Sequence, residues 1–336
     1  MADSAFSVFY AKQQNRHHLA NHPETPERAA QLLAGALDYG LVWRTPADSG
    51  LAAAAAVHSP ALLSFFPTAY QRFAQLKEGP RPAVPDSFAV RELSGHIPRS
   101  IWGQLGHYCS DALTPIMEGT WVAAYWSAQA AVAGALAIDS GARLAYALCR
   151  PPGHHAYHDL YGGFCYLNNA AIAAQILVDR GRRPAILDID YHHGNGTQAI
   201  FYERADVFFG SLHANPEEEY PYYCGFAHEV GRGEGEGYSL NLPLPPATEE
   251  VAYLRTLDHA MKAIIDFRPD VLLVSLGFDT LAGDSQGEMK LHPSSFRLIG
   301  RTLAEARLPI LLVQEGGYRL ASLRPAVTAL LEGIGY

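Results

Sequence analysis

Short, continuously apolar runs alternate with helix-like segments from about residue 120 to the end of this 336-residue chain. Runs of this kind are typical of strands that are buried on both faces of a parallel sheet. The alternation therefore predicts an α/β fold with a central, mostly parallel sheet and helices on both faces. The strand-like runs are residues 143–150, 184–190, 207–212, 270–279 and 309–318, and the helix-like segments are residues 121–141, 168–181, 251–267 and 294–308.

The chain is expected to form one domain over residues 1–336, because no linker, internal repeat or low-complexity tract divides it. Folds of the α/β class often remain single at this length. Residues 78–118 interrupt the alternation and are rich in proline and glycine. A loop this long inside a compact domain is usually functional or is ordered by a partner.

The formal net charge of −9 argues against nucleic acid or an anionic membrane surface as a partner, since both need a basic protein face. The N-terminal residues lack the layout of a signal peptide, and no apolar run approaches the roughly 18 residues of a membrane span. Four scattered cysteines without a CxxC pair fit reduced thiols. We therefore expect a soluble, cytoplasmic protein.

Five polar loops follow the strand-like runs: RPPGHH, DIDYHHGNG, SLHAN, GFDT and EGGY. In open parallel sheets, ligand sites lie beyond the carboxyl ends of the strands. We therefore expect the five loops to meet at one edge of the sheet. The most unusual is the stretch ILDIDYHHGNG, residues 186–196, which carries two aspartates and two histidines at the end of a buried strand.

Asp190, His192 and Asp279 form a candidate metal site at these strand ends. Residues i and i+2 of a strand face the same way, so Asp190 and His192 can point together. Asp279 would supply a third ligand from a neighbouring strand end. Two carboxylates and one imidazole suit a divalent metal that keeps an open coordination position. The alternative for any single strand-end aspartate is a helix or loop cap.

His154 and His155 follow a Pro-Pro-Gly turn and are candidate acid–base groups. With a metal nearby, one imidazole can act as a general base on water while the other holds or donates a proton. Each imidazole needs an acceptor that fixes its tautomer, and Asp188 and Asn195 are the candidates. The alternative is that the two histidines cap a turn. His193 has no role in this scheme.

Tyr318 follows two glycines at the last strand end. Its hydroxyl could stabilise the oxyanion formed from a metal-polarised carbonyl, although an isolated tyrosine there would more often be a core aromatic. The chain has no GxSxG elbow, and none of its cysteines lies in a nucleophile motif. Together these residues predict a metal-assisted amide hydrolase that forms no covalent intermediate.

In order and spacing, these motifs resemble the histone deacetylase superfamily. The resemblance covers roughly residues 5–335 and is carried by RPPGHHA, GGFCYLNNAAIAA, ILDIDYHHGNGTQ, SLHAN, GFDT and QEGGY. The stretches EEEYPYYCGFAHEVGRGEGEGYSLNLPLP and ALTPIMEGTW are similar to the bacterial acetylpolyamine amidohydrolase branch, whose members are class II-like deacetylases. The resemblance implies an arginase-like α/β fold whose central sheet has about eight strands.

The resemblance also implies a role for each candidate residue. It makes His155 the general base, His154 the electrostatic or general-acid partner of His155, and Tyr318 the group that binds the substrate carbonyl. Zinc is the implied metal, although Fe(II) and Co(II) suit the same ligands. The implied zinc ligands are Asp190, His192 and Asp279.

Structural K⁺ or Na⁺ sites are implied as well. Phe164 and Tyr220 match positions that wall the acyl-lysine tunnel, and the carbonyl of Gly163 would accept the substrate amide hydrogen. Gly317 is a further expected substrate contact. The first monovalent cation site would involve Asp188, Asp190, His192, Ser211 and Leu212, and the second would involve Phe201, Val207 and Tyr238.

Asn195 separates this chain from class I deacetylases, which have an aspartate after the HHG motif. Class II and polyamine deacetylases share the asparagine. A neutral partner stabilises an imidazolium less than a carboxylate does, so we expect His155 to serve as a base near neutral pH.

In the polyamine branch, the long segment before GTW forms much of a homodimer interface and narrows the tunnel mouth. The resemblance gives residues 78–118 the same role. A narrow mouth admits slim substrates such as acetylputrescine, acetylcadaverine or longer acetylpolyamines, which would be cleaved to acetate and free amine. A distal ammonium would need a carboxylate as its partner. Two alternatives stay open, binding this ammonium or simple exposure on the surface, for each of Glu92, Asp111, Glu118 and Glu217 to Glu219.

Three other functions compete with this interpretation. A lysine deacetylase acting on peptides or proteins is the nearest. An arginase-type ureohydrolase needs a second paired aspartate near Asp279, where this chain has Thr280 and Leu281. A non-catalytic acetyl-ligand binding protein would lack a ligand or the tyrosine, and every expected residue is present.

Overall fold

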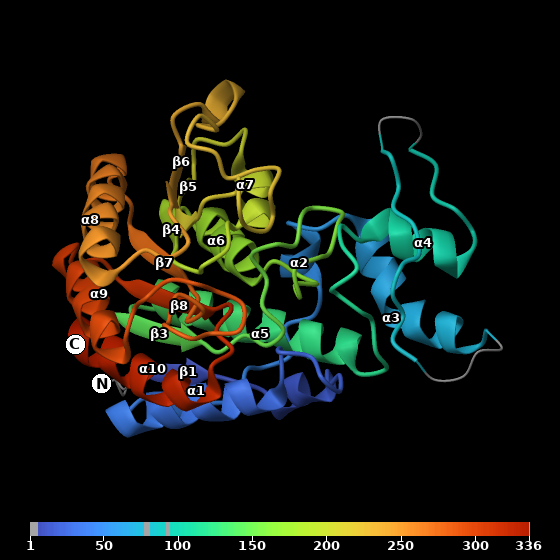
Figure 1. Ribbon diagram of the computed structural model, residues 1–336, viewed down its shortest axis with the longest axis horizontal. Coiled ribbons are helices and arrows are strands. Elements are labelled where there is room, and N and C mark those ends of the chain that lie inside the picture. The colour runs from blue at the N-terminus through green and yellow to red at the C-terminus, as the bar shows by residue number, and fades with distance from the viewer. Residues whose placement is uncertain (1–5, 77–80, 92–94, 336) are drawn as a thin grey trace.

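The computed structural model describes residues 6–76, 81–91 and 95–335. Eight strands form one sheet in the order β2-β1-β3-β8-β7-β4-β5-β6 (Figure 1). Every neighbouring pair is parallel. The prediction of a mostly parallel sheet of about eight strands is confirmed. The strands are β1 Ser7–Phe9, β2 Val42–Arg44, β3 Leu144–Ala147, β4 Pro184–Asp188, β5 Phe208–Ala214, β6 Ser239–Leu244, β7 Val271–Leu276 and β8 Ile310–Gln314.

Helices cover both faces of the sheet. Alternation along β3 shows the division, because Leu144 and Tyr146 pack into one apolar cluster while Ala145 and Ala147 pack into the other. The first cluster includes residues of α1, α8, α9 and α10, and the second includes residues of α3, α5 and α6. The helices are α1 Pro26–Tyr39, α2 Ala52–Ala55, α3 Pro60–Ala74, α4 Ile101–Tyr108, α5 Thr120–Asp139, α6 Asn169–Asp179, α7 Asn195–Phe201, α8 Glu250–Phe267, α9 Pro293–Glu305 and α10 Leu320–Ile334.

Three strands lie outside the predicted apolar runs. β2 and β6 are the two edges of the sheet, and each has side chains that are partly or fully exposed. A half-exposed edge strand does not need a continuously apolar sequence. β1 is buried but only three residues long, which is too short to give a periodic signal.

The expectation that no apolar run reaches the length of a membrane span is wrong for one helix. By length and composition, α5 could cross a membrane. However, 61% of its apolar window is buried, and α5 packs against α6 and the sheet. The core helix of a soluble α/β protein has the same composition.

The described parts of the segment 78–118, residues 81–91 and 95–118, have structure of their own. They contain α4, which packs beside α3 (Figure 1), and Ala83 pairs with Ile116 in an antiparallel bridge. The segment ends just before α5, and its later part contacts the loop that follows β3, because the N–H of Tyr161 donates to the carbonyl of Tyr108 at 2.8 Å. This contact brings the segment close to the loops at the strand ends.

Candidate active site

The loop after β4 brings Asp190 and His192 together. β4 ends at Asp188, so the two residues lie beyond the strand, and the expectation that strand alternation aligns them is wrong. Hydrogen bonds align them instead. The N–H of Asp190 donates to Asp188 Oδ1 at 3.1 Å, and the N–H of His192 donates to Asp190 Oδ1 at 2.9 Å. Each carboxylate thus fixes the backbone two residues further on, as in an Asx turn.

Asp190, His192 and Asp279 form a compact group whose potential ligand atoms lie within 4.8 Å of one another. Asp279 Oδ2 is buried without a hydrogen-bond partner. Burial, followed by the charge of Asp190, raises the pKa of Asp279, and a cation held between them would relieve that cost. A Cβ at Gly316 would lie 2.2 Å from Asp279 Oδ2, so the glycine keeps this space open. The three residues fit a divalent metal.

His154 and His155 lie beside this group with their ring centroids 4.0 Å apart and their ring planes tilted by 41°. His154 Nδ1 lies 3.0 Å from Asp188 Oδ2, and His155 Nδ1 lies 2.7 Å from Asn195 Oδ1. The amide nitrogen of Asn195 donates to the Tyr157 hydroxyl at 3.1 Å, which leaves the amide oxygen facing His155. His155 Nδ1 therefore carries the hydrogen, and Nε2 is the basic nitrogen.

The two histidines have opposite electrostatic environments. Burial lowers the pKa of His155 well below its usual value, and the neighbouring His154 and His192 lower it further. Burial also acts to lower the pKa of His154, but the carboxylates of Asp188 and Asp190 outweigh it and raise that pKa to about 10. Near neutral pH the pair therefore consists of a neutral imidazole and an imidazolium.

Tyr318 faces the same space from the loop after β8. Its N–H donates to Asp284 Oδ2 at 2.6 Å, and the guanidinium of Arg28 lies 4.6 Å from its ring centroid. Arg28 also donates to the carbonyls of Gly317 at 2.5 Å and Glu315 at 2.7 Å. Burial raises the pKa of Tyr318 well above its usual value, so its hydroxyl remains a hydrogen-bond donor.

A cavity of about 440 Å³ joins these groups to solvent. Phe164 and Tyr220 line it as predicted, and Gly163 also lines it. A Cβ at Gly163 would lie 2.2 Å from the ring of His155, so a larger side chain would not fit there. Gly317 is not among the described residues that line the cavity, and its carbonyl accepts a hydrogen bond from Arg28, so a substrate contact there stays a prediction.

The structure shows which of the acidic residues proposed as partners of a distal ammonium line the cavity. Asp111 Oδ2 accepts hydrogen bonds from the N–H of Gly163 at 2.5 Å and the hydroxyl of Tyr220 at 3.0 Å, so it ties the two walls together. Glu219 lines the cavity. Among the described lining residues, Asp111, Glu118, Glu217 and Glu218 do not appear, and Glu92 lies outside the described residues.

The expected monovalent cation sites remain predictions. Asp188 and Ser211 are paired across β4 and β5, and Ser211 Oγ lies 2.8 Å from His213 Nδ1. At the second position, the carbonyl of Phe201 accepts from the N–H of Arg204 at 3.0 Å, and that of Tyr238 accepts from the N–H of Phe209 at 2.9 Å. Asp188 is the last residue of β4, whereas Val207 and Tyr238 directly precede β5 and β6.

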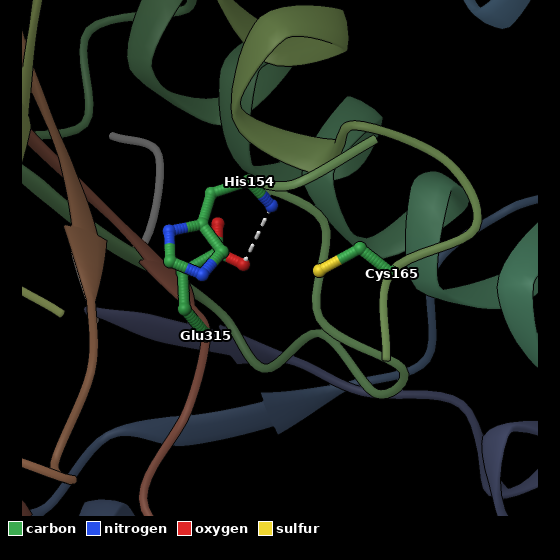
Figure 2. A group of neighbouring side chains, drawn as sticks. All are labelled: His154, Cys165 and Glu315. Atoms are coloured by element: carbon green, nitrogen blue, oxygen red, sulfur yellow. Dashed lines mark hydrogen bonds between the residues drawn. The ribbon is translucent and has the colours of Figure 1, made fainter. Parts of the chain in front are cut away.

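Glu315 was missed from the sequence, although it stands in the EGGY loop. It is fully buried, and its Oε2 accepts from the N–H of Gly153 at 2.7 Å. The same oxygen accepts from the N–H of His154 at 3.1 Å (Figure 2). Glu315, His154 and Cys165 form a second group with potential ligand atoms close together. However, His154 Nδ1 is committed to Asp188, and burial keeps the Cys165 thiol protonated by raising its pKa. Glu315 therefore anchors the turn that carries the two histidines.

His193, which had no predicted role, belongs to a separate buried network. Its Nε2 lies 3.1 Å from Gln198 Oε1, and its ring packs against His213 with the centroids 4.6 Å apart. The amide of Gln198 in turn donates to Glu229 Oε2 at 2.6 Å. His193 thus points away from the metal group and fixes the loop before α7.

Comparison with known proteins gives the site its context. A family model described as the histone deacetylase domain matches residues 22–334. The acetylpolyamine amidohydrolase of Burkholderia pseudomallei (strain 1710b) is 45% identical over 312 residues, which are 93% of this chain and 91% of that protein. The acetylpolyamine amidohydrolase of Mycoplana ramosa is 43% identical over 314 residues, 93% of this chain and 92% of that protein.

A solved structure agrees with these relatives. The crystal structure of an acetylpolyamine aminohydrolase from Burkholderia pseudomallei superimposes with a TM-score of 0.95 at 41% sequence identity, and the match covers 98% of this chain and 99% of that chain. Since the family match runs through every loop that builds the cavity, this chain belongs to the histone deacetylase family.

Proposed function

We propose that this protein is a metal-dependent amidohydrolase that removes the acetyl group from acetylated polyamines and releases acetate and the free amine. The observation that carries the proposal is that Asp190, His192, His154, His155 and Tyr318 all line one cavity. Family membership and the names of the two amidohydrolase relatives support the same reaction and the same substrate class.

Asp190, His192 and Asp279 would hold the metal, and zinc is the proposed ion, with Fe(II) and Co(II) as alternatives. A divalent metal bound there supplies Lewis-acid polarisation of the acetamide carbonyl and makes water more acidic. Asp279 Oδ2 supports this assignment, because it is buried, accepts no hydrogen bond and lies 3.4 Å from His192 Nδ1. K⁺ or Na⁺ near Asp188 and Ser211 is part of the same proposal.

The chain's own residues then transfer protons and stabilise the charge that develops on the carbonyl oxygen. His155 Nε2 accepts a proton from the attacking water, because its Nδ1 is held by Asn195. The Tyr318 hydroxyl donates to the carbonyl oxygen as negative charge develops on it. His154, held as an imidazolium by Asp188, stabilises that charge, and His155 passes the proton it took from water to the nitrogen of the departing amine as the C–N bond breaks. The carbonyl of Gly163 accepts the amide hydrogen of the substrate.

A substrate panel combined with metal analysis tests the proposal. We expect kcat/KM on acetylputrescine to exceed that on an acetyllysine peptide, with about one equivalent of divalent metal per chain for a single three-ligand site. A higher rate on the peptide would favour the lysine deacetylase alternative. Hydrolysis of neither substrate by the metal-loaded protein would contradict the proposed reaction.

The assembly and location remain part of the proposal. Residues 78–118 are proposed to form the contacts of a homodimer and the rim of the cavity, and the protein is proposed to work in the cytoplasm. The exposed apolar side chains of Phe88, Val90 and Ile97 in that segment support such a contact. Sedimentation of the purified full chain distinguishes a dimer from a monomer.

Replacing Asn195 by aspartate is expected to shift the acidic limb of the pH–rate profile upward. The new carboxylate would stabilise the imidazolium of His155 and raise its pKa. His155 accepts protons only while neutral, so activity would be lost on acidification at a higher pH than in the wild type. The measurement is kcat/KM against pH.

Asn215→Asp adds the same charge outside the cavity and should leave the acidic limb in place. An unchanged limb in Asn195→Asp, with metal content equal to wild type, would count against His155 as the base.

A further inference from the structure

The peptide group between Gly163 and Phe164 lies at the wall of the active-site cavity, which both residues line. Both have left-handed backbone, with φ of 56° at Gly163 and 67° at Phe164. This conformation is unfavourable for a residue with a side chain, so contacts around Phe164 have to hold it in place. A flip of the peptide group would return Phe164 to a favourable negative φ, and it would turn the Gly163 carbonyl around at the same time.

Thr114, from the segment 78–118, holds this peptide group. Its Oγ1 accepts a hydrogen bond from the N–H of Phe164 at 2.9 Å. The Thr114 hydroxyl itself donates to Asp111 Oδ1 at 2.9 Å, and Thr114 is only 1% exposed. A hydroxyl has a single hydrogen, so with that hydrogen on the carboxylate its oxygen faces Phe164 as an acceptor.

Asp111 is fixed by four hydrogen bonds, two at each carboxylate oxygen. Besides the Thr114 hydroxyl, Oδ1 accepts from the N–H of Leu113 at 2.8 Å. Oδ2 accepts from the N–H of Gly163 at 2.5 Å and from the hydroxyl of Tyr220 at 3.0 Å. Asp111 and Thr114 therefore hold the N–H groups of two consecutive residues, Gly163 and Phe164.

These contacts also determine where the Gly163 carbonyl points. The N–H and the C=O of one trans peptide group point in opposite directions, so the Gly163 carbonyl points away from Thr114. There it accepts from the Cys165 thiol at 3.3 Å, and burial keeps that thiol protonated by raising its pKa. A carbonyl oxygen has two lone pairs, so one remains for the amide hydrogen of a substrate.

We propose that Thr114 is a positioning residue for the reaction, because it holds the peptide group whose carbonyl accepts the substrate amide hydrogen. Asp111 acts through Thr114 by fixing the direction of its hydroxyl. This inference rests on the proposed deacetylase function, in which the Gly163 carbonyl binds the substrate amide. An acceptor that is held before the substrate arrives needs no reorganisation during the reaction.

The test replaces Thr114 by valine, which keeps the shape of the side chain and removes the hydroxyl. It compares acetylputrescine with its ester analogue, in which an oxygen atom replaces the amide N–H. Only the amide has a hydrogen for the Gly163 carbonyl. We therefore expect the ratio of kcat/KM on the amide to kcat/KM on the ester to fall about threefold to tenfold, the scale of one hydrogen bond. Activity on the ester and the metal content should stay at the wild-type level.

Thr114→Ser keeps the hydroxyl and should restore the wild-type ratio. Thr68→Val makes the same change as Thr114→Val at an exposed position in α3, and its ratio should equal that of the wild type. A wild-type ratio in Thr114→Val overturns the proposal. An equal loss on amide and ester overturns it as well, because that result would show a purely structural role.

Hydrogen exchange tests the positioning without a substrate. The N–H of Phe164 should exchange about threefold to tenfold faster in Thr114→Val than in the wild type, and at the wild-type rate in Thr114→Ser. If the wild type cleaves neither compound, the proposed function fails. In that case, and also if the wild type cleaves only the amide, exchange decides whether Thr114 holds this peptide group, and an unchanged rate in Thr114→Val overturns it.

Discussion

Replacing His155 by glutamine should lower kcat by roughly 10²- to 10⁴-fold, the usual contribution of a positioned general base. His155 is the neutral member of the histidine pair, because burial and the neighbouring His154 and His192 hold its pKa well below the usual value. Its Nδ1 is held by Asn195 at 2.7 Å, which leaves Nε2 to take the proton. A base acts mainly in the transition state, so KM should change little.

His158→Gln provides the matched control, since it makes the same change in the same loop. His158 is exposed, and its Nδ1 lies 2.7 Å from the carbonyl of Val57, away from the cavity. Both variants should retain the metal content of the wild type, because neither residue belongs to the metal group. A His155→Gln enzyme that is folded, metal-loaded and within tenfold of wild-type kcat would contradict the assignment of the base.

The sheet and the meeting of its loops could be predicted because buried parallel strands need continuous apolar sequence. β4, β7 and β8 are fully buried, so their ends, and hence the loops carrying Asp190, Asp279 and Tyr318, were visible in the sequence. The edge strands β2 and β6 and the three-residue β1 gave no such signal.

Most of the groups that hold the reactive residues in place could not be identified from the sequence. Arg28 in α1 reaches the carbonyls of Glu315 and Gly317, nearly the length of the chain away. A contact to a backbone carbonyl depends only on the path of the chain, so no side-chain pattern marks it. Glu315 is the exception, because it stands inside the QEGGY motif that also carries Tyr318.

The choice among the acidic residues also needed the structure. Glu217, Glu218 and Glu219 are consecutive in the sequence, yet only Glu219 lines the cavity. In irregular backbone there is no period that assigns a direction to each side chain. Asp111 shows the same limit, since the structure uses it to join Gly163 and Tyr220 rather than to face the substrate.

Replacing Tyr318 by phenylalanine should lower kcat by about a hundredfold or more, the scale for losing one oxyanion donor. The substitution removes a single oxygen atom. The ring would keep its contacts with Arg28, at 4.6 Å from the centroid, and with Phe164, whose ring centroid lies 5.9 Å away. We therefore expect KM and the melting temperature to stay close to the wild-type values, so the loss would reside in the chemical step.

Tyr223→Phe makes the same change at a side chain that is 90% exposed, and its kcat should equal that of the wild type. Because burial keeps the Tyr318 phenol protonated, the loss of kcat in Tyr318→Phe should be the same from about pH 6 to about pH 9. A loss of kcat that came from a disturbed His155 would instead change with pH, because His155 accepts protons only while neutral. Near-wild-type kcat in Tyr318→Phe would show that the hydroxyl does not support the developing charge, and the oxyanion would then depend on the metal and His154 alone.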